Sequence, residues 1–224
     1  MERLGPELFF DLGESLPLFY RGGLVWEMIR GLPKFVEHSF ALGMAKKVSP
    51  VRRWAYYFRR IHVGKKVAIG AGTVIFPGAY IGEGVIIGRN CRIGQNAVLK
   101  GPLVLFDNCV VGPSGEVGHS IFFSGARAAH KNFVGDSIIG ARVNLGAGAE
   151  TANWKLDGSE IGLWVGEKRI QTGLTKFGAV VGDGSSIGGN TVFQPGALLG
   201  KNCRVGPLVV VPNRYHPDGT VLKG

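Results

Sequence analysis

An aliphatic residue recurs at every sixth position from Val63 to Val117. Glycine directly follows most of these residues, and a second, usually small, inward candidate lies four positions after each of them. An amphipathic helix repeats about every 3.6 residues and a strand about every two, so neither explains a period of six. A short strand followed by a corner explains the period of six, because the aliphatic residue points inward and glycine occupies the turn. The pattern therefore predicts a solenoid whose coils bury their anchors by stacking.

Three such units form one triangular coil, so equivalent positions should recur after three hexads. Hexad repeats of this kind resemble the left-handed parallel β-helix, and only that resemblance implies the left hand. We expect an all-β fold, a left-handed parallel β-helix of hexapeptide repeats with an extruded loop and a short N-terminal helical extension. The expected divisions are a helical and basic extension (1–62), the β-helix domain (63–212) and a C-terminal tail (213–224).

The phase of the repeat changes along the chain. A second register covers residues 133–145 and 181–205, with Phe133 as its first inward anchor. We expect an insertion or a distorted coil within 119–132. The second register stops at about 152–180 and resumes in phase, which indicates a loop extruded from a regular corner. Loops on rigid scaffolds are common places for function.

The net charge of +10 is unevenly placed. No acidic residue occurs between Glu37 and Glu83, whereas this interval holds eight basic residues, with aromatic residues such as Trp54 among them. Three interpretations stay open: a segment packed on the first coil, contact with an anionic membrane surface, or nucleic-acid binding. No nucleic-acid motif accompanies the segment, so we expect no nucleic-acid partner. Residues 46–66 are candidates for peripheral contact with a membrane or for contact with a partner enzyme.

The three cysteines, Cys91, Cys109 and Cys203, occupy the same inward position of the hexad. We expect buried, reduced thiols. No CxxC and no paired histidine spacing is present, so no metal site is predicted. Residues 1–20 carry four acidic residues, and the chain has no apolar run of about 18 residues. We therefore expect neither a signal peptide nor a spanning helix, and a cytoplasmic protein.

Apolar residues from Leu24 to Met44 follow a helical spacing, and Pro33 is expected to end or kink that helix. The extension has too little sequence for an enzyme domain. We interpret it as a cap or docking element.

Residues 117–176 depart from the repeat and gather polar side chains, His119 among them. The segment AAHKNFVGDSIIGARVNLGAGAETANWKLDG (128–158) resembles the acetyltransferase half of bacterial glucosamine-1-phosphate acetyltransferase/UDP-N-acetylglucosamine pyrophosphorylases. The segment is more similar still to the archaeal sugar-1-phosphate nucleotidylyltransferase/acetyltransferases. The segment GEKRIQTGLTKFGAVVGD (166–183), in which the chain returns from the loop, also resembles these archaeal proteins. FFDLGESLPLF…VWE (9–27) resembles a segment preceding the β-helix in some bacterial relatives. Residues 1–62 hold no Gly-rich nucleotide loop, so no nucleotidylyltransferase activity is expected.

The resemblance implies acyl transfer from acetyl-CoA to an amino sugar or its phosphate or nucleotide derivative. It implies that His130 is the general base, since a neutral imidazole accepts a proton near pH 7. Asn144 and Asn153 match asparagines that bind the sugar through amides that donate and accept hydrogen bonds. It also implies a homotrimer with sites between adjacent subunits.

The resemblance assigns further candidates to the acceptor and to CoA. On the acceptor side, Phe133 replaces the family's tyrosine, Trp154 is placed to stack on a sugar face, and Arg127 is the one basic residue where the bacterial enzymes bind sugar phosphate with lysine. Ala147, with Gly146 and Gly148, matches a strip along which pantetheine runs. Candidates for the CoA phosphates are Lys168, Arg169 and Lys176.

The missing tyrosine and lysine support a second hypothesis, a catalytically silent β-helix scaffold or regulatory protein that binds a sugar nucleotide or a partner enzyme. A membrane-surface O-acyltransferase is a third. The presence of His130, Asn144 and Asn153 together favours the enzyme.

Overall fold

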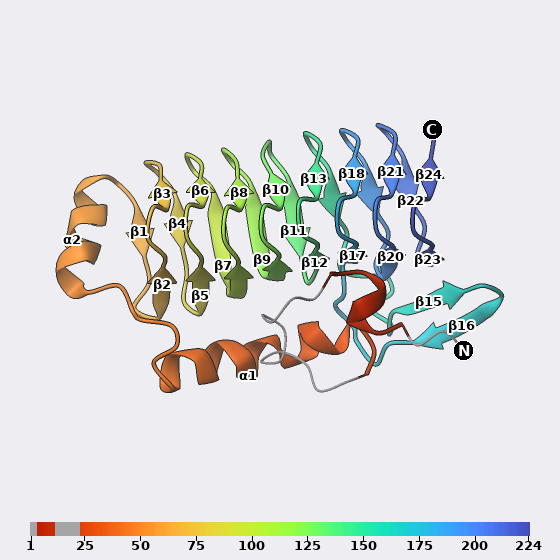
Figure 1. The fold of residues 1–224 in the computed structure, drawn as a ribbon, viewed down its shortest axis with the longest axis horizontal. Helices are drawn as coiled ribbons and strands as arrows, with labels where there is room; N and C mark the ends of the chain where they lie inside the picture. The colour runs from red at the N-terminus through yellow and green to blue at the C-terminus, as the bar shows by residue number, and fades with distance from the viewer. Residues whose placement is uncertain (1–3, 12–22) are drawn as a thin grey trace.

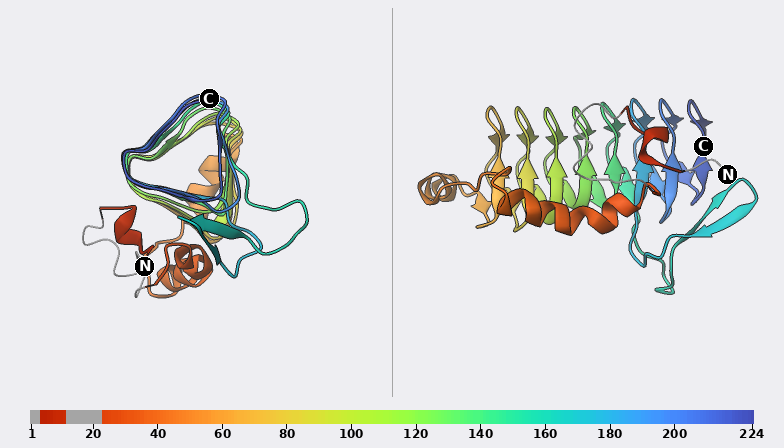
Figure 2. Two further views of the ribbon diagram at one scale, coloured as in Figure 1. Left: turned by 90° about the vertical axis from the view of Figure 1, so that its right-hand side faces the viewer. Right: turned by 60° about the horizontal axis from the view of Figure 1, so that its bottom comes forward.

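The computed structural model describes residues 4–11 and 23–224. They form a left-handed parallel β-helix of about nine coils, which confirms the predicted fold class. Seen along its axis the solenoid is a triangle (Figure 2). Two helices and a hairpin lie outside the triangle (Figure 1).

The triangle has three faces, each a stack of short parallel strands. The first face contains β1 (His62–Val63), β4 (Tyr80–Ile81), the start of β7 (Val98–Leu105), the start of β9 (Glu116–Phe122), β11 (Phe133–Gly135), β14 (Glu150–Thr151), β19 (Val192–Phe193) and β22 (Val210–Val211). The second contains β2 (Val67–Ile69), β5 (Val85–Ile87), the ends of β7 and β9, β12 (Ile138–Ile139), β17 (Ala179–Val181), β20 (Ala197–Leu199) and β23 (Tyr215–His216). The third contains β3 (Val74–Ile75), β6 (Arg92–Ile93), β8 (Val110–Val111), β10 (Arg127–Ala128), β13 (Asn144–Leu145), β18 (Ser186–Ile187), β21 (Arg204–Val205) and β24 (Val221–Leu222).

The predicted anchors, with the exception of Phe133, point into the interior of the triangle. His62 pairs with Tyr80, which lies three hexads later in the chain, as the triangular coil requires. Anchors such as Ile81, Leu99 and Val117 are fully buried. The three cysteines lie in the same core as free, buried thiols, as predicted.

The register change comes from distorted coils, one of the two expected causes, and not from an insertion. Glu116 pairs with Phe133, and Phe133 pairs with Glu150, so each of these coils is one residue shorter than three hexads. The residue is missing at the corner that follows the first face. Two residues separate Lys100 from Leu103 in β7, but only one separates their partners, Gly118 and Ser120, in β9. Because a one-residue shift reverses a side chain's direction, the predicted anchor Phe133 points outward. Val134 is the buried residue instead.

The second face is covered by the N-terminal part of the chain (Figure 2). Its outward residues are aliphatic in every coil but the last, which has Tyr215, and in this the face differs from the other two: Ala68, Ile86, Val104, Ile121, Ile138, Val180 and Leu198. All of them except Ala68 pack with apolar residues of η1 (Pro6–Leu8), of the residues around it and of α1 (Glu27–Ala41). α1 continues through Pro33, which does not end it. Residues 12–22 of the segment that resembles bacterial relatives lie outside the described residues.

The loop predicted at about 152–180 leaves the corner after β14 and returns before β17. It contains the antiparallel hairpin of β15 (Gly162–Val165) and β16 (Lys168–Gln171). Ile161 and Leu163 bury the base of the loop in the N-terminal cluster. Residues 213–224, expected as a tail, continue the solenoid instead, because β23 and β24 pair with β20 and β21.

α2 (Pro50–Phe58) lies across the beginning of the solenoid (Figure 1). Within residues 4–11 and 23–224, no helix has the length and apolar character needed to cross a bilayer.

Candidate functional site

The corner between the first and second faces, here called the loop corner, collects polar side chains from successive coils. His119 follows the first-face part of β9, Asp136 follows β11, and Asn153 follows β14 where the loop begins. The shortened coils place all three in line. His119 and Asp136 have left-handed φ angles of 46° and 47°. Such angles are uncommon for residues other than glycine and are often found at functional sites.

These three side chains form one hydrogen-bonded chain. His119 Nδ1 lies 2.5 Å from one carboxylate oxygen of Asp136, and Asn153 Nδ2 donates to the other oxygen, also at 2.5 Å. Asp136 is buried, whereas the His119 side chain is about one-third exposed. A carboxylate only accepts, so the Nδ1–H of a neutral imidazole donates to Asp136 and its lone pair stays on Nε2. That Nε2 is buried and has no hydrogen-bond partner among the described residues.

A second layer of hydroxyls holds the loop corner from inside. Ser137 Oγ donates to the Gly135 carbonyl at 2.7 Å, lies 2.9 Å from the hydroxyl oxygen of Thr151, and accepts from the Ala179 amide. Ser120 Oγ accepts from the Ser137 amide. Buried and satisfied networks of this kind fix geometry, so the loop corner is a rigid mount for Asp136 and its partners.

Three further candidates from the sequence lie at the loop corner. A Cβ on Gly135 would meet Asn153 Nδ2 at 2.6 Å and Phe133 Cζ at 3.1 Å, so the Phe133 ring leans toward this corner. Lys176 Nζ lies 5.9 Å from the centroid of the half-exposed Trp154 ring. A pocket beside Trp154 is lined by Lys155, Leu156, Asp157, Gln194, Pro195 and Asn213.

His130 lies at a different corner, between the third and first faces. Its side chain is exposed, and none of the described residues bonds to its ring. Its carbonyl accepts from the Gly148 amide, and its amide donates to Asn132 Oδ1 at 3.0 Å. The strip at 146–148 belongs to the next coil of this corner. Its exposed side chain is that of Ala147.

Gly146 and Gly148 are explained by the packing of the coils. A Cβ on Gly146 would lie 2.6 Å from the carbonyl carbon of Gly188, and Gly148 has a φ of +69°. Both positions therefore need glycine whether or not a ligand approaches.

The structure does not bring the remaining candidates together with His130 and the loop corner. Arg127 and Asn144 are adjacent on the outside of the third face, where β10 and β13 pair. Lys168 and Arg169 are exposed on the hairpin, which projects away from the solenoid (Figure 1). Of the three lysine and arginine candidates for CoA phosphates, Lys176 alone lies at the loop corner.

Sequence reasoning passed over His119 and Asp136 as site residues. Their signal was the interval from His119 to Asp136, which recurs from Asp136 to Asn153. It was hidden because the hexad pattern predicts three full hexads per coil, and this interval is one residue shorter. Over residues 4–11 and 23–224, no cluster of three His, Cys, Asp or Glu side chains is arranged to hold a metal ion.

The family model for bacterial transferase hexapeptide repeats matches residues 62–101 and 178–213. The predicted resemblance to hexapeptide-repeat transferases is thus confirmed, with the repeats themselves matched over these two stretches. It is 34% identical over 127 residues to "Bifunctional protein GlmU" of Methanocaldococcus jannaschii, a match covering 57% of this chain and 31% of the relative. It is 37% identical over 120 residues to "Bifunctional sugar-1-phosphate nucleotidylyltransferase/acetyltransferase" of Sulfurisphaera tokodaii, covering 54% and 30%. The matches therefore span about a third of the length of these relatives.

Among solved structures, the chain is similar to UDP-N-acetylglucosamine acyltransferase from Campylobacter jejuni, with a TM-score of 0.45 and 16% identity over 72% of this chain and 70% of that one. It is also similar to the acetyltransferase domain of PglB from Neisseria gonorrhoeae, with a TM-score of 0.42 and 20% identity over 68% and 54% of the two chains.

Proposed function

We propose that this protein is a CoA-dependent acyltransferase, which transfers acetyl from acetyl-CoA to an amino sugar or to its phosphate or nucleotide derivative. One curated relative carries acetyltransferase in its name beside a sugar-1-phosphate activity. The proposal assigns acetyl transfer alone to this chain.

The observation that carries the proposal is the loop corner. It presents the amide of Asn153 and the half-exposed ring of Trp154, with the buried Nε2 of His119 beside them. Amides and imidazoles recognise hydroxyl and amino groups, and an indole stacks on the apolar face of a sugar ring. The loop corner therefore suits the acceptor sugar better than it suits a thioester.

We assign the proton transfer to His130. An amine that attacks the thioester carbonyl forms a bond from nitrogen to carbon and must lose a proton. His130 accepts this proton, a backbone N–H stabilises the oxyanion, and collapse of the tetrahedral intermediate breaks the C–S bond. The departing CoA thiolate then takes the proton from His130. Its exposed imidazole beside Ala147 supports this role, since an exposed alanine leaves room for the pantetheine arm.

His130 and the loop corner lie at the two edges of the first face, so we place the reaction between protomers of a homotrimer. The second face is covered by the N-terminal helices, which leaves the first and third faces open for packing. The first face exposes Val192 and Val210, and the loop exposes Leu156 completely. A neighbour packed on the first face would cover this apolar surface and would meet both corners.

The first test combines binding and turnover. Acetyl-CoA at about 100 times its dissociation constant should stabilise the folded state by about 2.7 kcal/mol. With an amino-sugar acceptor, His130→Ala should lower kcat by about 10²–10⁴-fold while acetyl-CoA still stabilises the protein.

The controls separate the two histidines. His119→Ala should mainly raise the KM for the acceptor. If His119→Ala removes kcat and His130→Ala does not, the assignment of the base to His130 is wrong. Acetyl-CoA binding without turnover of any amino sugar would favour the scaffold hypothesis.

A further inference from the structure

The N-terminal end of the solenoid carries an exposed helix of unusual composition. α2 begins at Pro50, and Ser49 Oγ caps it by accepting from the Arg52 amide at 3.2 Å. The helix lies across the end of the solenoid, beyond the first coil (Figure 1). We call the outward side chains of this helix and of the two residues after it the terminal surface, defined by Val51, Arg52, Arg53, Trp54, Tyr57, Phe58, Arg59 and Arg60.

Large apolar side chains dominate the terminal surface. Val51 is 81% exposed, Trp54 63%, Tyr57 71% and Phe58 77%. The three rings contact one another, with centroids 5.9–6.1 Å apart, and so form one continuous patch. A contiguous apolar patch on a soluble surface is costly unless it has a partner.

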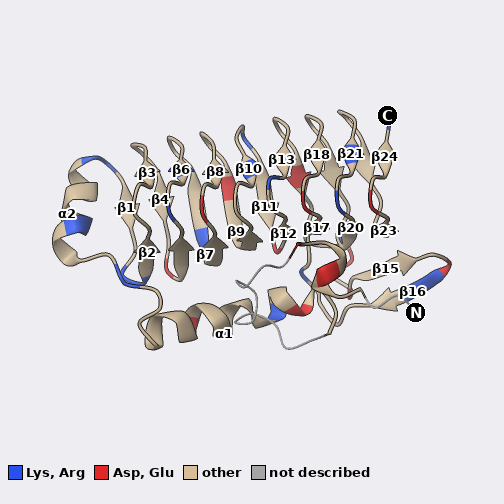
Figure 3. Cartoon of the chain, viewed as in Figure 1, with Lys and Arg blue, Asp and Glu red and all other residues tan. Residues whose placement is uncertain are grey.

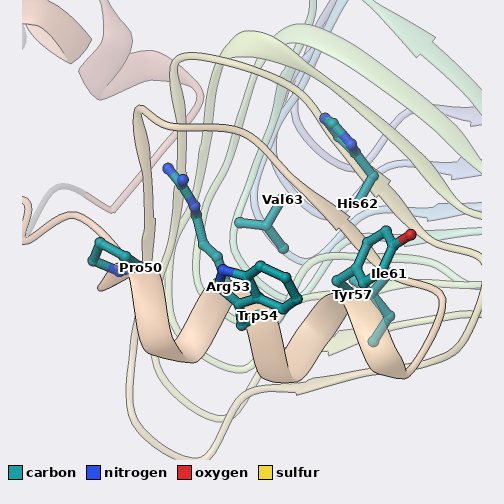
Figure 4. A pocket seen from close by; sticks show the side chains of 7 residues that line it. All are labelled: Pro50, Arg53, Trp54, Tyr57, Ile61, His62 and Val63. Carbon is teal, nitrogen blue, oxygen red and sulfur yellow. The ribbon is translucent and has the colours of Figure 1, made fainter.

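The terminal surface is not the face by which α2 packs on the solenoid. Tyr56 is the buried residue of the helix, and it joins the core together with Ile61 at the start of the first coil. Trp54 and Tyr57 line a pocket against Ile61 and Val63, with Arg53 and His62 beside it (Figure 4). Their remaining surface faces solvent.

Positive charge surrounds the aromatic patch (Figure 3). None of the four arginines of the terminal surface forms an ion pair with a described residue. The two acidic residues nearest in sequence, Glu37 and Glu83, are bonded to lysines instead. Glu83 accepts the Lys65 and Lys66 amides at 2.8 and 2.7 Å, and Glu37 pairs with Lys66 Nζ at 3.3 Å.

We propose that the terminal surface docks this protein on an anionic lipid surface. Aromatic and aliphatic side chains on one helix face enter the boundary between headgroups and acyl chains, while adjacent arginines bind lipid phosphates. A second copy fits poorly, because end-to-end packing would bring two sets of arginines together. A nucleic acid fits less well than lipid, because bases stack on aromatic rings, whereas the patch also exposes the aliphatic side chain of Val51.

The experiment is co-sedimentation of the full chain with phosphatidylcholine vesicles, with and without an equal share of phosphatidylglycerol. We expect binding to the mixed vesicles alone, and release by salt. Arg52→Glu with Arg59→Glu should weaken partitioning at least about 25-fold, since each basic residue near such a surface contributes about fivefold. The matched control is Arg204→Glu with Lys223→Glu, which changes the net charge equally at the other end of the solenoid.

The aromatic residues give an independent arm. Trp54→Ser with Phe58→Ser should also release the protein from the vesicles. On vesicle binding, tryptophan fluorescence should shift to the blue in the unmutated chain, and Trp54→Phe should abolish this shift. Circular dichroism of each variant checks that exposed substitutions leave the fold unchanged.

Three results would overturn the proposal. The first is vesicle binding that neither double variant weakens. The second is the absence of vesicle binding together with salt-sensitive binding of a duplex or single-stranded oligonucleotide. The third is self-association through α2, detected by sedimentation velocity, in a protein that binds no vesicles.

Discussion

Asp136 occupies the centre of the loop corner because both of its oxygens are used, one by His119 and one by Asn153. A carboxylate can accept on both sides at once, whereas an amide offers one acceptor and one donor. The identity of the residue at 136 therefore controls which ring nitrogen of His119 carries the proton and how the Asn153 amide is oriented. This dependence can be tested by a change of a single atom.

Asp136→Asn should cost about 1–3 kcal/mol of unfolding free energy, because a buried group loses one of its two partners. It should also raise the acceptor KM by at least tenfold, while acetyl-CoA binding is retained. Urea unfolding and steady-state kinetics measure the two effects. Asp218→Asn is the matched control, since Asp218 also binds a corner amide, that of Lys201, outside the loop corner. Equal losses in both variants would mean that Asp136 is only a corner residue.

His216 makes stability depend on pH. The side chain is 6% exposed, and its burial lowers the pKa below the ordinary histidine value. In the pH range between the folded pKa and about 6.5, the unfolded chain binds more protons at this site than the folded one. Unfolding free energy should therefore fall as pH drops below about 6.5, by at most about 1.4 kcal/mol per pH unit from this group.

Removing the titrating group tests this sign. His216→Leu should flatten the slope of unfolding free energy against pH between about 5 and 6.5. His62→Gln, at an exposed position of the first strand, is the control. An unchanged slope in His216→Leu would assign the acid sensitivity to other groups.

At the scale of elements, the hexad period was sufficient to predict the coils, because each inward anchor repeats where the geometry demands it. It was insufficient for the corner at which the repeat shortens. Phe133 and Val134 are both apolar, so hydrophobicity alone could not show which one is inside. The shortened coils, which put Val134 inside, also align Asp136 with His119 and Asn153. The error in the fold and the omission in the site thus have one cause.

The outward residues of the second face form a second pattern, which is independent of the inward anchors of the hexads. A solenoid face with aliphatic residues on both sides requires a cover, and Trp26, Ile29 and Leu32 supply it. Trp26 is 1% exposed and lies against Phe177, with ring centroids 6.3 Å apart.

Trp26→Ala should therefore destabilise the protein by about 3–5 kcal/mol, as truncation of a buried aromatic side chain does. Because Phe177 ends the loop, the same change should increase proteolysis within 152–177. Chemical unfolding and limited proteolysis measure these effects. Trp164→Ala, at a position 36% exposed, should cost much less. Similar losses in both variants would argue against the covering role of the N-terminal segment.

At the scale of the whole molecule, the two uncovered faces and the two separated corners raise one question, which is whether a single protomer can hold a complete site. His130 precedes β11, and Asn153 follows β14, so the breadth of the first face lies between them. If the site forms between protomers, the two residues act from different chains. The particle should then have three times the 23.9 kDa mass of one chain, which light scattering measures.

Mixing variants decides where the site forms. His130→Ala and Asn153→Ala should each be strongly impaired alone. When the two are unfolded together and reassembled in equal amounts, about a quarter of the interfaces should combine an intact His130 with an intact Asn153 from a neighbour, and activity should return to that extent. The double variant mixed with either single variant should give no recovery. Recovery fails in every mixture if both residues act within one chain, because no protomer then carries both, and the placement of the site between protomers would be wrong.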